Sequence, residues 1–430
     1  MQLEEIYQLY LQHSVVTTDS RNVPAGSLFF ALKGDSFNGN AFAKSAIEKG
    51  AAYAFVDEEE FVDSERILFT DDVLKTLQQL ANYHRKQFAG KVIGITGTNG
   101  KTTTKELIAA VLSKKYNTLC TTGNLNNHIG VPLTLLRLNA THEMAVIEMG
   151  ANHCGEIEFL CNIAEPDFGI ITNVGKAHLE GFGSFEGVMR TKGELYNSIR
   201  KNEGTIFINR DNEYLQEIAT GIRRIEYGNT TGLFVSGQSR ITSNPYLSMI
   251  WQFGDDEKKQ YLETHLIGDY NLENILAAIT IGNYFGVNTA DINAAISNYI
   301  PQNNRSQLTK TATNTLIIDA YNANPTSMLA SLLNFRAMGV SSKAVILGAM
   351  LELGDENEKE HQKIILFLEE SRFEHVFLIG KEFSSLHNSF MSFSSTSDLI
   401  EYFKENPLSG QTILLKGSRG FKLEQLIDCL

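Results

Sequence analysis

The sequence predicts an α/β protein of three domains, the last of them Rossmann-like. The chain has 430 residues, more than one hydrophobic core usually supports. Apolar strand-like segments alternate with helical segments along most of the chain, as in parallel sheets that helices cover on both faces. The alternation occurs in three separate stretches, so we expect domains over residues 1–86, 87–302 and 303–430.

The first domain is expected to be a small α/β unit. Strand-like runs cover Ser27–Leu32, Tyr53–Val56 and Arg66–Phe69, and a helix is expected near Ala41–Lys49. A helical stretch from Val73 to Phe88 closes this unit.

The central domain is expected to hold a mostly parallel sheet. Its predicted strands are buried apolar runs with turn residues behind them, namely KVIGIT, MAVIEMG, FGIITNVG and GTIFINR. Helical patterns lie between the strands, for example GEIEFLCNIA and FEGVMRTKGELYNSI. Residues 230–265 show more polar alternation and predict additional β structure, after which GDYNLENILAAITIGNYFG returns to a helix.

The third domain repeats the strand and helix alternation from near Asn303. Its predicted strands are TLIIDAY, KAVILGAM, HVFLIG and TILLKGS. Ligands of open parallel sheets bind at the carboxyl ends of the strands, and polar motifs follow the strands of both the second and the third domain. The sequence therefore predicts an active site in a cleft between these two domains.

Composition restricts the possible functions. The formal net charge is −13, and no segment is rich in Lys and Arg, which argues against binding to duplex nucleic acid. An acidic protein that handles phosphates must gather its cations, backbone amides and metal ions in one pocket. The four cysteines show no CxxC spacing, as expected in a reducing compartment. Without an apolar signal core or a run of roughly 18 apolar residues, the chain is expected to be cytosolic.

The strongest local signal is a phosphate-binding loop directly after KVIGIT. The loop consists of Gly97, Thr98, Asn99, Gly100, Lys101, Thr102 and Thr103. A glycine-rich turn between a strand and a helix presents free backbone N–H groups to an anion. Lys101 would reach the outer phosphates, and the Thr102 hydroxyl would bind Mg²⁺. Ile95 replaces the first glycine of GxxxxGK[ST], so the loop is a compact variant that predicts nucleoside triphosphate binding but leaves motor, kinase, switch or ligase open.

Three residues further along the chain could complete a metal site. Glu148 ends the strand MAVIEMG, where its carboxylate would point into the phosphate cleft and bind Mg²⁺ together with phosphate oxygens and water. His178 lies in the glycine-rich loop AHLEGFGS, and Lys192 lies in the helical segment MRTKGELY. Taken alone, each of the three is a weak signal, because such side chains are often only solvated.

In their order and spacing, GTNGKTT, EMGA, AHLEGFGS and TKGELY resemble the Mur ligase superfamily. The resemblance implies ATP and two Mg²⁺ ions, with Glu148 and His178 holding the second ion. It also implies that CO₂ carbamylates Lys192 and so creates an anion that supports this metal. Carbamylation requires a neutral amine, which at a pKa of about 10.4 is on the order of one Lys in a thousand near pH 7.4. Nearby divalent cations would favour the carbamate over the ammonium.

The resemblance extends over essentially the whole chain and implies residues that bind the UDP-linked substrate. The segment TTDSRNVPAGSLFFALKGDSFNGNAF is similar to the family's UDP-sugar-binding segment, in which Ser20 and Arg21 match nucleotide contacts and Lys33 lies in the accompanying loop. The segment NLNNHIGVPLTLL is similar to the family's muramoyl-side loop, with Asn126 and Asn127 matching.

The resemblance implies further residues around ATP. GDYNLENILAA resembles the family's adenine-contacting motif, with Asn271 and Asn274 matching. Arg305 matches an Arg that reaches the nucleotide phosphates, and Asp319 matches a residue that binds the ribose. The implied catalytic residues are Lys101, His178, Lys192 and Arg305.

Two C-terminal stretches indicate which reaction the resemblance implies. IDAYNANPTSM, which contains Asn322 and Asn324, and LGAMLELGDENEKEH look like the family members that join D-alanyl-D-alanine to UDP-N-acetylmuramoyl-tripeptide. The DNPR-type motif expected of the diaminopimelate-adding relatives is absent from the sequence. Whether the third residue of the tripeptide is diaminopimelate or lysine stays open.

Other functions stay open at this point. A folylpolyglutamate synthase or a different Mur ligase would resemble the same superfamily, although the UDP-type segment argues against the folate enzyme. Alternatives of another class are a P-loop switch NTPase that moves a partner and a catalytically silent homologue that acts as a binding module. We expect a cytoplasmic monomer that binds neither nucleic acid nor membranes.

Overall fold

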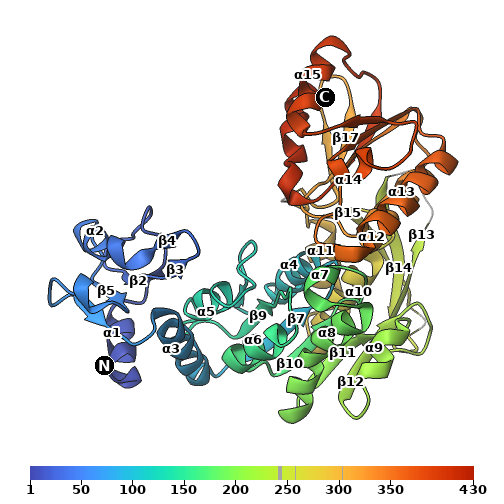
Figure 1. The fold of residues 1–430 in the computed structure, drawn as a ribbon. Helices are drawn as coiled ribbons and strands as arrows, with labels where there is room; N and C mark the ends of the chain where they lie inside the picture. Colours follow the sequence, from blue (N-terminus) through green and yellow to red (C-terminus); the bar gives the residue numbers. More distant parts are fainter. Residues whose placement is uncertain (241–244, 257, 303) are drawn as a thin grey trace.

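The computed structural model describes residues 1–240, 245–256, 258–302 and 304–430, and it confirms the predicted α/β class. These residues form sheets of four, nine and six strands and a two-stranded hairpin. Figure 1 shows the four-stranded sheet to the left of the nine-stranded sheet, and the six-stranded sheet above the nine-stranded one. The domain limit predicted at Asn303 falls outside the described residues, as does part of the segment 230–265.

The N-terminal sheet is small and parallel, with the strand order β1-β2-β5-β6. Its elements are α1 (Leu3–Gln12), β1 (Val16–Thr17), β2 (Leu28–Phe30), the hairpin β3 (Lys33–Gly34) and β4 (Phe37–Asn38), α2 (Ala43–Glu48), β5 (Tyr53–Val56), β6 (Ile67–Phe69) and α3 (Val73–Gln87). The sequence predicts β2, α2, β5, β6 and α3 to within a few residues. It does not predict α1, β1 or the hairpin, whose strands of two residues are too short to show a pattern.

Helix α3 anchors this N-terminal unit to the central sheet (Figure 1). Leu77 on its inner face is fully buried. The guanidinium of Arg85, which is 8% exposed, donates to the carbonyl oxygens of Ala164 and Glu165, each at 2.9 Å. The same guanidinium pairs with the Asp167 carboxylate at 3.0 Å. Charged hydrogen bonds therefore fix the C-terminal end of α3.

The central sheet has nine strands in the order β15-β14-β13-β12-β11-β10-β7-β9-β8. They are β7 (Lys91–Thr96), β8 (Thr118–Cys120), β9 (Met144–Glu148), β10 (Phe168–Ile171), β11 (Thr205–Asn209), β12 (Arg223–Gly228), β13 (Val235–Arg240), β14 (Tyr246–Phe253) and β15 (Gln260–Ile267). The strands from β8 to β13 run parallel, whereas β14 and β15 are antiparallel additions. The four strands predicted for this domain are confirmed, and the β structure predicted for residues 230–265 consists of β13, β14 and β15.

Helices cover both faces of the central sheet, as the sequence predicts. They are α4 (Lys101–Leu112), α5 (Gly130–Leu135), α6 (Glu156–Ala164), α7 (Leu179–Phe182), α8 (Phe185–Lys201), α9 (Glu213–Ile218), α10 (Asn271–Tyr284) and α11 (Thr289–Ser297). One apolar core includes Leu160 of α6 and Leu195 of α8, and a second includes Leu107 of α4 and Ile275 of α10. In the described part of the chain, no helix has both the length and the apolar character that crossing a bilayer requires.

The C-terminal sheet has the strand order β16-β17-β21-β18-β19-β20, in which only β16 is antiparallel to its neighbour. Its elements are β16 (Gln307–Lys310), β17 (Thr315–Asp319), α12 (Pro325–Ala337), β18 (Lys343–Gly348), α13 (Asn357–Ser371), β19 (His375–Ile379), α14 (Lys381–Ser384), β20 (Met391–Phe393), α15 (Thr396–Glu405) and β21 (Thr412–Lys416). The four predicted strands are β17, β18, β19 and β21. Two apolar clusters cover the sheet, which confirms its Rossmann-like construction.

Replacing Arg85 by Met tests the anchor, because the Asp167 carboxylate loses its nearest charged partner and the carbonyl groups of Ala164 and Glu165 lose a charged hydrogen bond. We expect Arg85→Met to lower the free energy of unfolding by about 3 kcal/mol, as when one partner of a buried ion pair is removed. Lys86→Met is the matched control, since the Lys86 side chain is 54% exposed and a surface pair contributes at most about 1 kcal/mol. Urea denaturation followed by circular dichroism measures the free energy of unfolding of both variants. Equal values for the two variants would contradict the anchoring role of Arg85.

Candidate functional site

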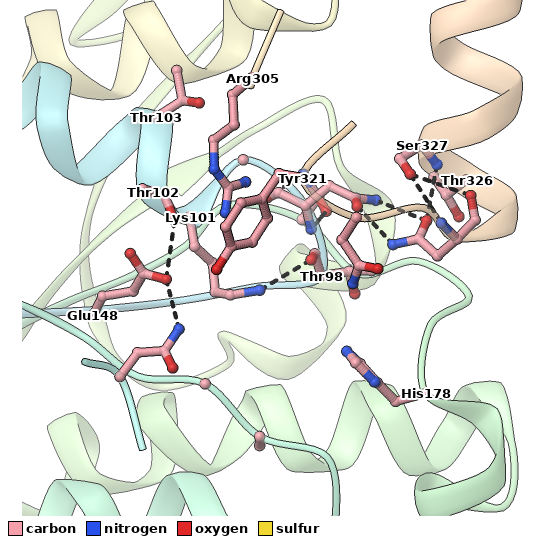
Figure 2. A pocket seen from close by; sticks show the side chains of 18 of the residues that line it. Thr98, Lys101, Thr102, Thr103, Glu148, His178, Arg305, Tyr321, Thr326 and Ser327 are labelled. Atoms are coloured by element: carbon pink, nitrogen blue, oxygen red, sulfur yellow. Dashed lines mark hydrogen bonds between the residues drawn. The ribbon is translucent and has the colours of Figure 1, made fainter. Parts of the chain in front are cut away.

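A cavity of about 710 Å³ lies between the carboxyl ends of the central strands and the C-terminal sheet (Figure 2). Loops after β7, β8, β9 and β10 line it from the central unit, and the loop after β17 and the end of β21 line it from the C-terminal unit. A cleft therefore exists where the sequence predicts one. That this cleft is the active site remains a prediction.

Two glycines shape the loop between β7 and α4. Gly97 (φ +145°) and Gly100 (φ +77°) have backbone conformations that L side chains rarely adopt. A Cβ atom on Gly97 would lie 2.0 Å from Thr172 Oγ1, and one on Gly100 would lie 2.5 Å from Asn274 Oδ1. The glycines allow the loop to fold closely against its neighbours, so that the first turn of α4 lines the cavity and its N–H groups are available to an anion.

The side chain of Lys101 folds back over this loop. Its Nζ donates to the carbonyl oxygens of Gly97 at 2.7 Å and Thr98 at 3.0 Å. Burial lowers the pKa of Lys101 to about 8; the Glu148 carboxylate opposes this decrease, and the Arg305 guanidinium adds to it. A phosphate would offer this ammonium a charged acceptor, which binds more strongly than neutral carbonyl groups.

Glu148 ends β9 beneath the loop and is 2% exposed. Its Oε1 accepts hydrogen bonds from Thr102 Oγ1 at 3.2 Å and Asn126 Nδ2 at 2.8 Å (Figure 2). Its Oε2 lies 3.7 Å from Lys105 Nζ and accepts no hydrogen bond from any described residue. A buried carboxylate that contacts a threonine hydroxyl at the cavity suits Mg²⁺, which takes one or two carboxylates together with phosphate oxygens and water.

His178 and Lys192 both lie near the ring of Phe182, and the charge of Lys101 acts on both. His178 Nδ1 contacts the Glu352 carboxylate of the C-terminal unit, and burial lowers the pKa of His178 while Glu352 opposes this decrease. Lys192 is 2% exposed, and its Nζ lies 5.2 Å from the ring centroid of Phe182. Burial, with the charge of Lys101, lowers the pKa of Lys192 to about 7. Much of the Lys192 amine is therefore neutral at pH 7.4, far more than for an exposed lysine.

The C-terminal wall of the cavity carries stacked cations. The Arg305 Cζ atom lies 3.8 Å from the ring centroid of Tyr321, and the Arg419 Cζ atom lies 5.4 Å from the same centroid (Figure 2 shows Arg305 and Tyr321). Arg305 Nε is buried and finds no hydrogen-bond acceptor among the described residues. Asp319, at the end of β17, pairs with Lys416 Nζ at 2.7 Å. A ligand hydroxyl would therefore share the Asp319 carboxylate with Lys416.

Direct contacts join the two units across the cleft. Asn324, which caps the N-terminus of α12, donates through Nδ2 to Asn99 Oδ1 of the phosphate loop at 2.8 Å. The Lys176 backbone N–H donates to Thr326 Oγ1 at 3.1 Å, and its Nζ pairs with Glu360 at 2.8 Å. The C-terminal unit thus touches the phosphate loop itself.

The cavity brings together most of the residues singled out from the sequence. Those that line it are Thr98, Asn99, Gly100, Lys101, Thr102, Thr103, Asn126, Asn127, Glu148, His178, Asn271, Asn274, Arg305, Asp319, Asn322 and Asn324. Gly97 and Lys192 are not among the lining residues, although Gly97 shapes the loop and Lys192 lies buried close by.

Three residues singled out as substrate contacts do not line this cavity. Ser20, Arg21 and Lys33 belong to the N-terminal unit. Arg21 pairs with Asp19 at 2.9 Å on the surface. Lys33 pairs with Asp57 and Glu58, each at 2.8 Å. If these residues bind substrate, they bind a part of it that extends well beyond the cleft.

Sequence reasoning missed four residues of the site, namely Lys105, Tyr321, Glu352 and Lys416. Lys105 carries a detectable signal, because it follows Lys101 by one helical turn and therefore lies on the same face of α4. Glu352 depends on how the C-terminal unit meets the central one, whereas Tyr321 and Lys416 depend on which strands pair within the C-terminal sheet. No local pattern in the sequence reports that geometry.

Family comparisons cover nearly the whole chain. Residues 13–102 match the description "Mur ligase family, catalytic domain", and residues 95–282 match "Mur ligase middle domain". Residues 304–419 match "Mur ligase, glutamate ligase domain".

Individual relatives agree with the family matches. The chain is 36% identical to the UDP-N-acetylmuramoyl-tripeptide--D-alanyl-D-alanine ligase of Bacillus subtilis, over 96% of this chain and 92% of that protein. Among solved structures, it is similar to MurF from Acinetobacter baumannii, with a TM-score of 0.88, 30% identity and 99% and 98% of the two chains covered. It is also similar to the MurF ligase from Thermotoga maritima in complex with ADP, with a TM-score of 0.85, 25% identity and 97% of each chain covered.

Gly100→Ala tests whether the loop geometry serves phosphate binding. The added Cβ would meet Asn274 Oδ1 in a backbone conformation that alanine disfavours, so the loop must distort. We expect the affinity for ADP, measured by calorimetry, to fall at least tenfold. Gly339→Ala is the control, because a Cβ there meets no atom within 4 Å. Unchanged ADP affinity in a folded Gly100→Ala protein would refute the assignment of this loop.

Proposed function

Since the chain belongs to the Mur ligase family, we propose that it joins D-alanyl-D-alanine to UDP-N-acetylmuramoyl-tripeptide at the expense of ATP. The observation that carries this proposal is the likeness, along almost the full chain, to a ligase named for that reaction. The cleft supports the proposal, because it combines a phosphate loop, a buried carboxylate and several cations at one place.

The proposed reaction has two steps. An oxygen of the tripeptide's terminal carboxylate attacks the γ-phosphorus of ATP; the bond to the β-phosphate oxygen breaks, and ADP leaves. The amine of D-alanyl-D-alanine then attacks the carbonyl carbon of the acyl phosphate. The amine loses a proton, and the C–O bond to phosphate breaks as the amide forms. Phosphorylation is needed because a free carboxylate would have to expel oxide.

The first step brings two anions together, so positive charge and positioning supply most of the catalysis. We assign Lys101 and Arg305 to the phosphates of ATP, with the backbone of Gly97–Thr103 as the phosphate cradle. When bound, one Mg²⁺ would be held by Thr102 and would neutralise phosphate charge. Asn271 and Asn274 are assigned to the adenine and Asp319 to the ribose.

A second metal requires another anion, and Lys192 can supply it as a carbamate. Among the described residues, no group of three or more His, Cys, Asp and Glu side chains forms a metal site by itself. Lys192 is buried near His178, and its pKa of about 7 leaves enough neutral amine to react with CO₂. We therefore assign the second Mg²⁺ to Glu148, His178 and carbamylated Lys192.

The muramoyl substrate would extend from the N-terminal unit to the cleft. We assign Ser20, Arg21 and Lys33 to the UDP portion, which lies outside the cleft. We assign Asn126 and Asn127, which line the cleft, to the muramoyl side of the substrate, and we assign Asn322 and Asn324 on the C-terminal wall to the substrate as well. Closure of the C-terminal unit would exclude water from the acyl phosphate.

We further propose a division into three domains and a monomeric protein. Domain limits at 86/87 and 302/303 fall near the end of α3 and between α11 and β16. A monomer that acts in the cytoplasm, without nucleic acid or membrane, suits a reaction between ATP and a nucleotide-linked precursor.

The function is tested by phosphate release against a matrix of acceptors and amines. We expect release above background only with a UDP-muramoyl tripeptide and D-alanyl-D-alanine together, and little with diaminopimelate or glutamate as the amine. Release with glutamate and a folate would instead indicate a folylpolyglutamate synthase. Release that needs no amine and forms no peptide bond would indicate a switch NTPase.

The carbamate on Lys192 is tested by ¹³C NMR of protein equilibrated with ¹³CO₂. Because the neutral amine reacts and the pKa is about 7, we expect one protein carbamate signal that grows as the pH rises from 6 to 8. The signal should vanish in Lys192→Ala, whose activity we expect to be nearly abolished and partly restored by a small added carboxylate. It should persist in Lys201→Ala, an exposed lysine at the end of the same helix. Persistence of the signal in Lys192→Ala would refute the assignment.

A further inference from the structure

A buried lysine behind Glu148 is not used by the proposed mechanism. Lys105 lies on α4 one turn after Lys101 and is 1% exposed. Its Nζ lies 3.7 Å from Glu148 Oε2 and 3.8 Å from Glu106 Oε1. These ion pairs are its polar contacts within the described residues, and no hydrogen bond accompanies them. Burial of an ammonium group without hydrogen bonds is costly, so a specific use of its charge is expected.

Lys105 and the cavity lie on opposite sides of the Glu148 carboxylate. On the cavity side, Thr102 and Asn126 both contact Oε1 and both line the cavity. Lys105 contacts Oε2 and is not among the residues that line the cavity. A bound ligand would therefore not touch Lys105, which can act only through Glu148.

The charge of Lys105 has two effects on Glu148. In the protein without ligands, it attracts the carboxylate and holds it between Lys105 and Thr102. When a divalent cation approaches the same carboxylate, the fixed positive charge of Lys105 repels it, and the repulsion is strong because the pair is buried and weakly screened. The negative charge of a triphosphate on the loop offsets this repulsion.

We propose that Lys105 is a positioning residue that orients Glu148 and keeps the affinity of the nucleotide-free protein for divalent cations low, so that metal and triphosphate enter together. The inference rests on the proposed function, because the metal site at Glu148 belongs to it. It adds a residue that makes metal binding conditional on the nucleotide.

Mn²⁺ binding, measured by electron paramagnetic resonance with and without ADP, tests this role. We expect nucleotide-free Lys105→Met protein to bind Mn²⁺ at least tenfold more tightly than the nucleotide-free parent. The increase in Mn²⁺ affinity that ADP causes should be smaller in the variant by the same factor. Lys105→Arg retains the charge and should behave as the parent does. Lys114→Met, which removes an exposed charge just beyond α4, should also leave both affinities unchanged.

Circular dichroism first establishes that each variant is folded, and Lys105→Gln replaces Lys105→Met if the latter is not. If a folded Lys105→Met or Lys105→Gln protein without nucleotide binds Mn²⁺ no more tightly than the parent, the inference is overturned. It is also overturned if Lys105→Arg increases the Mn²⁺ affinity as much as the neutral variant does. A parent protein that binds no Mn²⁺ even with ADP would overturn the metal site of the proposed function as well. The phosphate-release assay with different acceptors and amines then shows separately whether the protein catalyses the ligase reaction.

Discussion

Two anions must come within bonding distance in this cleft, and the charge arrangement of the site follows from that constraint. The chain as a whole is acidic, with a formal net charge of −13. At the cavity, however, the first turn of α4, which begins with Lys101, lies close to Arg305. The protein therefore concentrates positive charge where the reaction needs it and leaves its remaining surface acidic.

Burial gives similar side chains different roles in this site. Lys192 is buried close to another cation, so its pKa is lowered and its amine loses its proton easily, as the proposed carbamylation requires. Lys105 is buried beside two carboxylates and serves as their counter-ion. Lys416 is buried against Asp319 and fixes that carboxylate at the opposite wall. The environment of each lysine, and not its residue type, determines what it can do.

Much of the fold and the part of the site in the central unit could be predicted, because short stretches of consecutive residues encode them. The phosphate loop is encoded in consecutive residues, and Glu148 could be placed because it ends a clearly apolar strand. Strands of two residues, such as β1, gave no pattern. The Asn99–Asn324 pair could not be predicted, because it depends on how units far apart in the sequence meet. The stacking of Arg305 on Tyr321 could not be predicted either, because it depends on the antiparallel pairing of β16 with β17. The residues proposed to contact UDP could be named from the resemblance, but their separation from the cleft became visible only in the fold.

The proposed mechanism requires that an oxygen of the substrate carboxylate becomes bonded to phosphorus. Tripeptide substrate labelled with ¹⁸O in its terminal carboxylate tests this claim most directly, with the released phosphate analysed by mass spectrometry. One ¹⁸O atom should appear in each phosphate released during amide formation, because the attacking oxygen departs with the phosphoryl group. Amide formation with unlabelled phosphate would show that the carboxylate is not phosphorylated and would contradict the account.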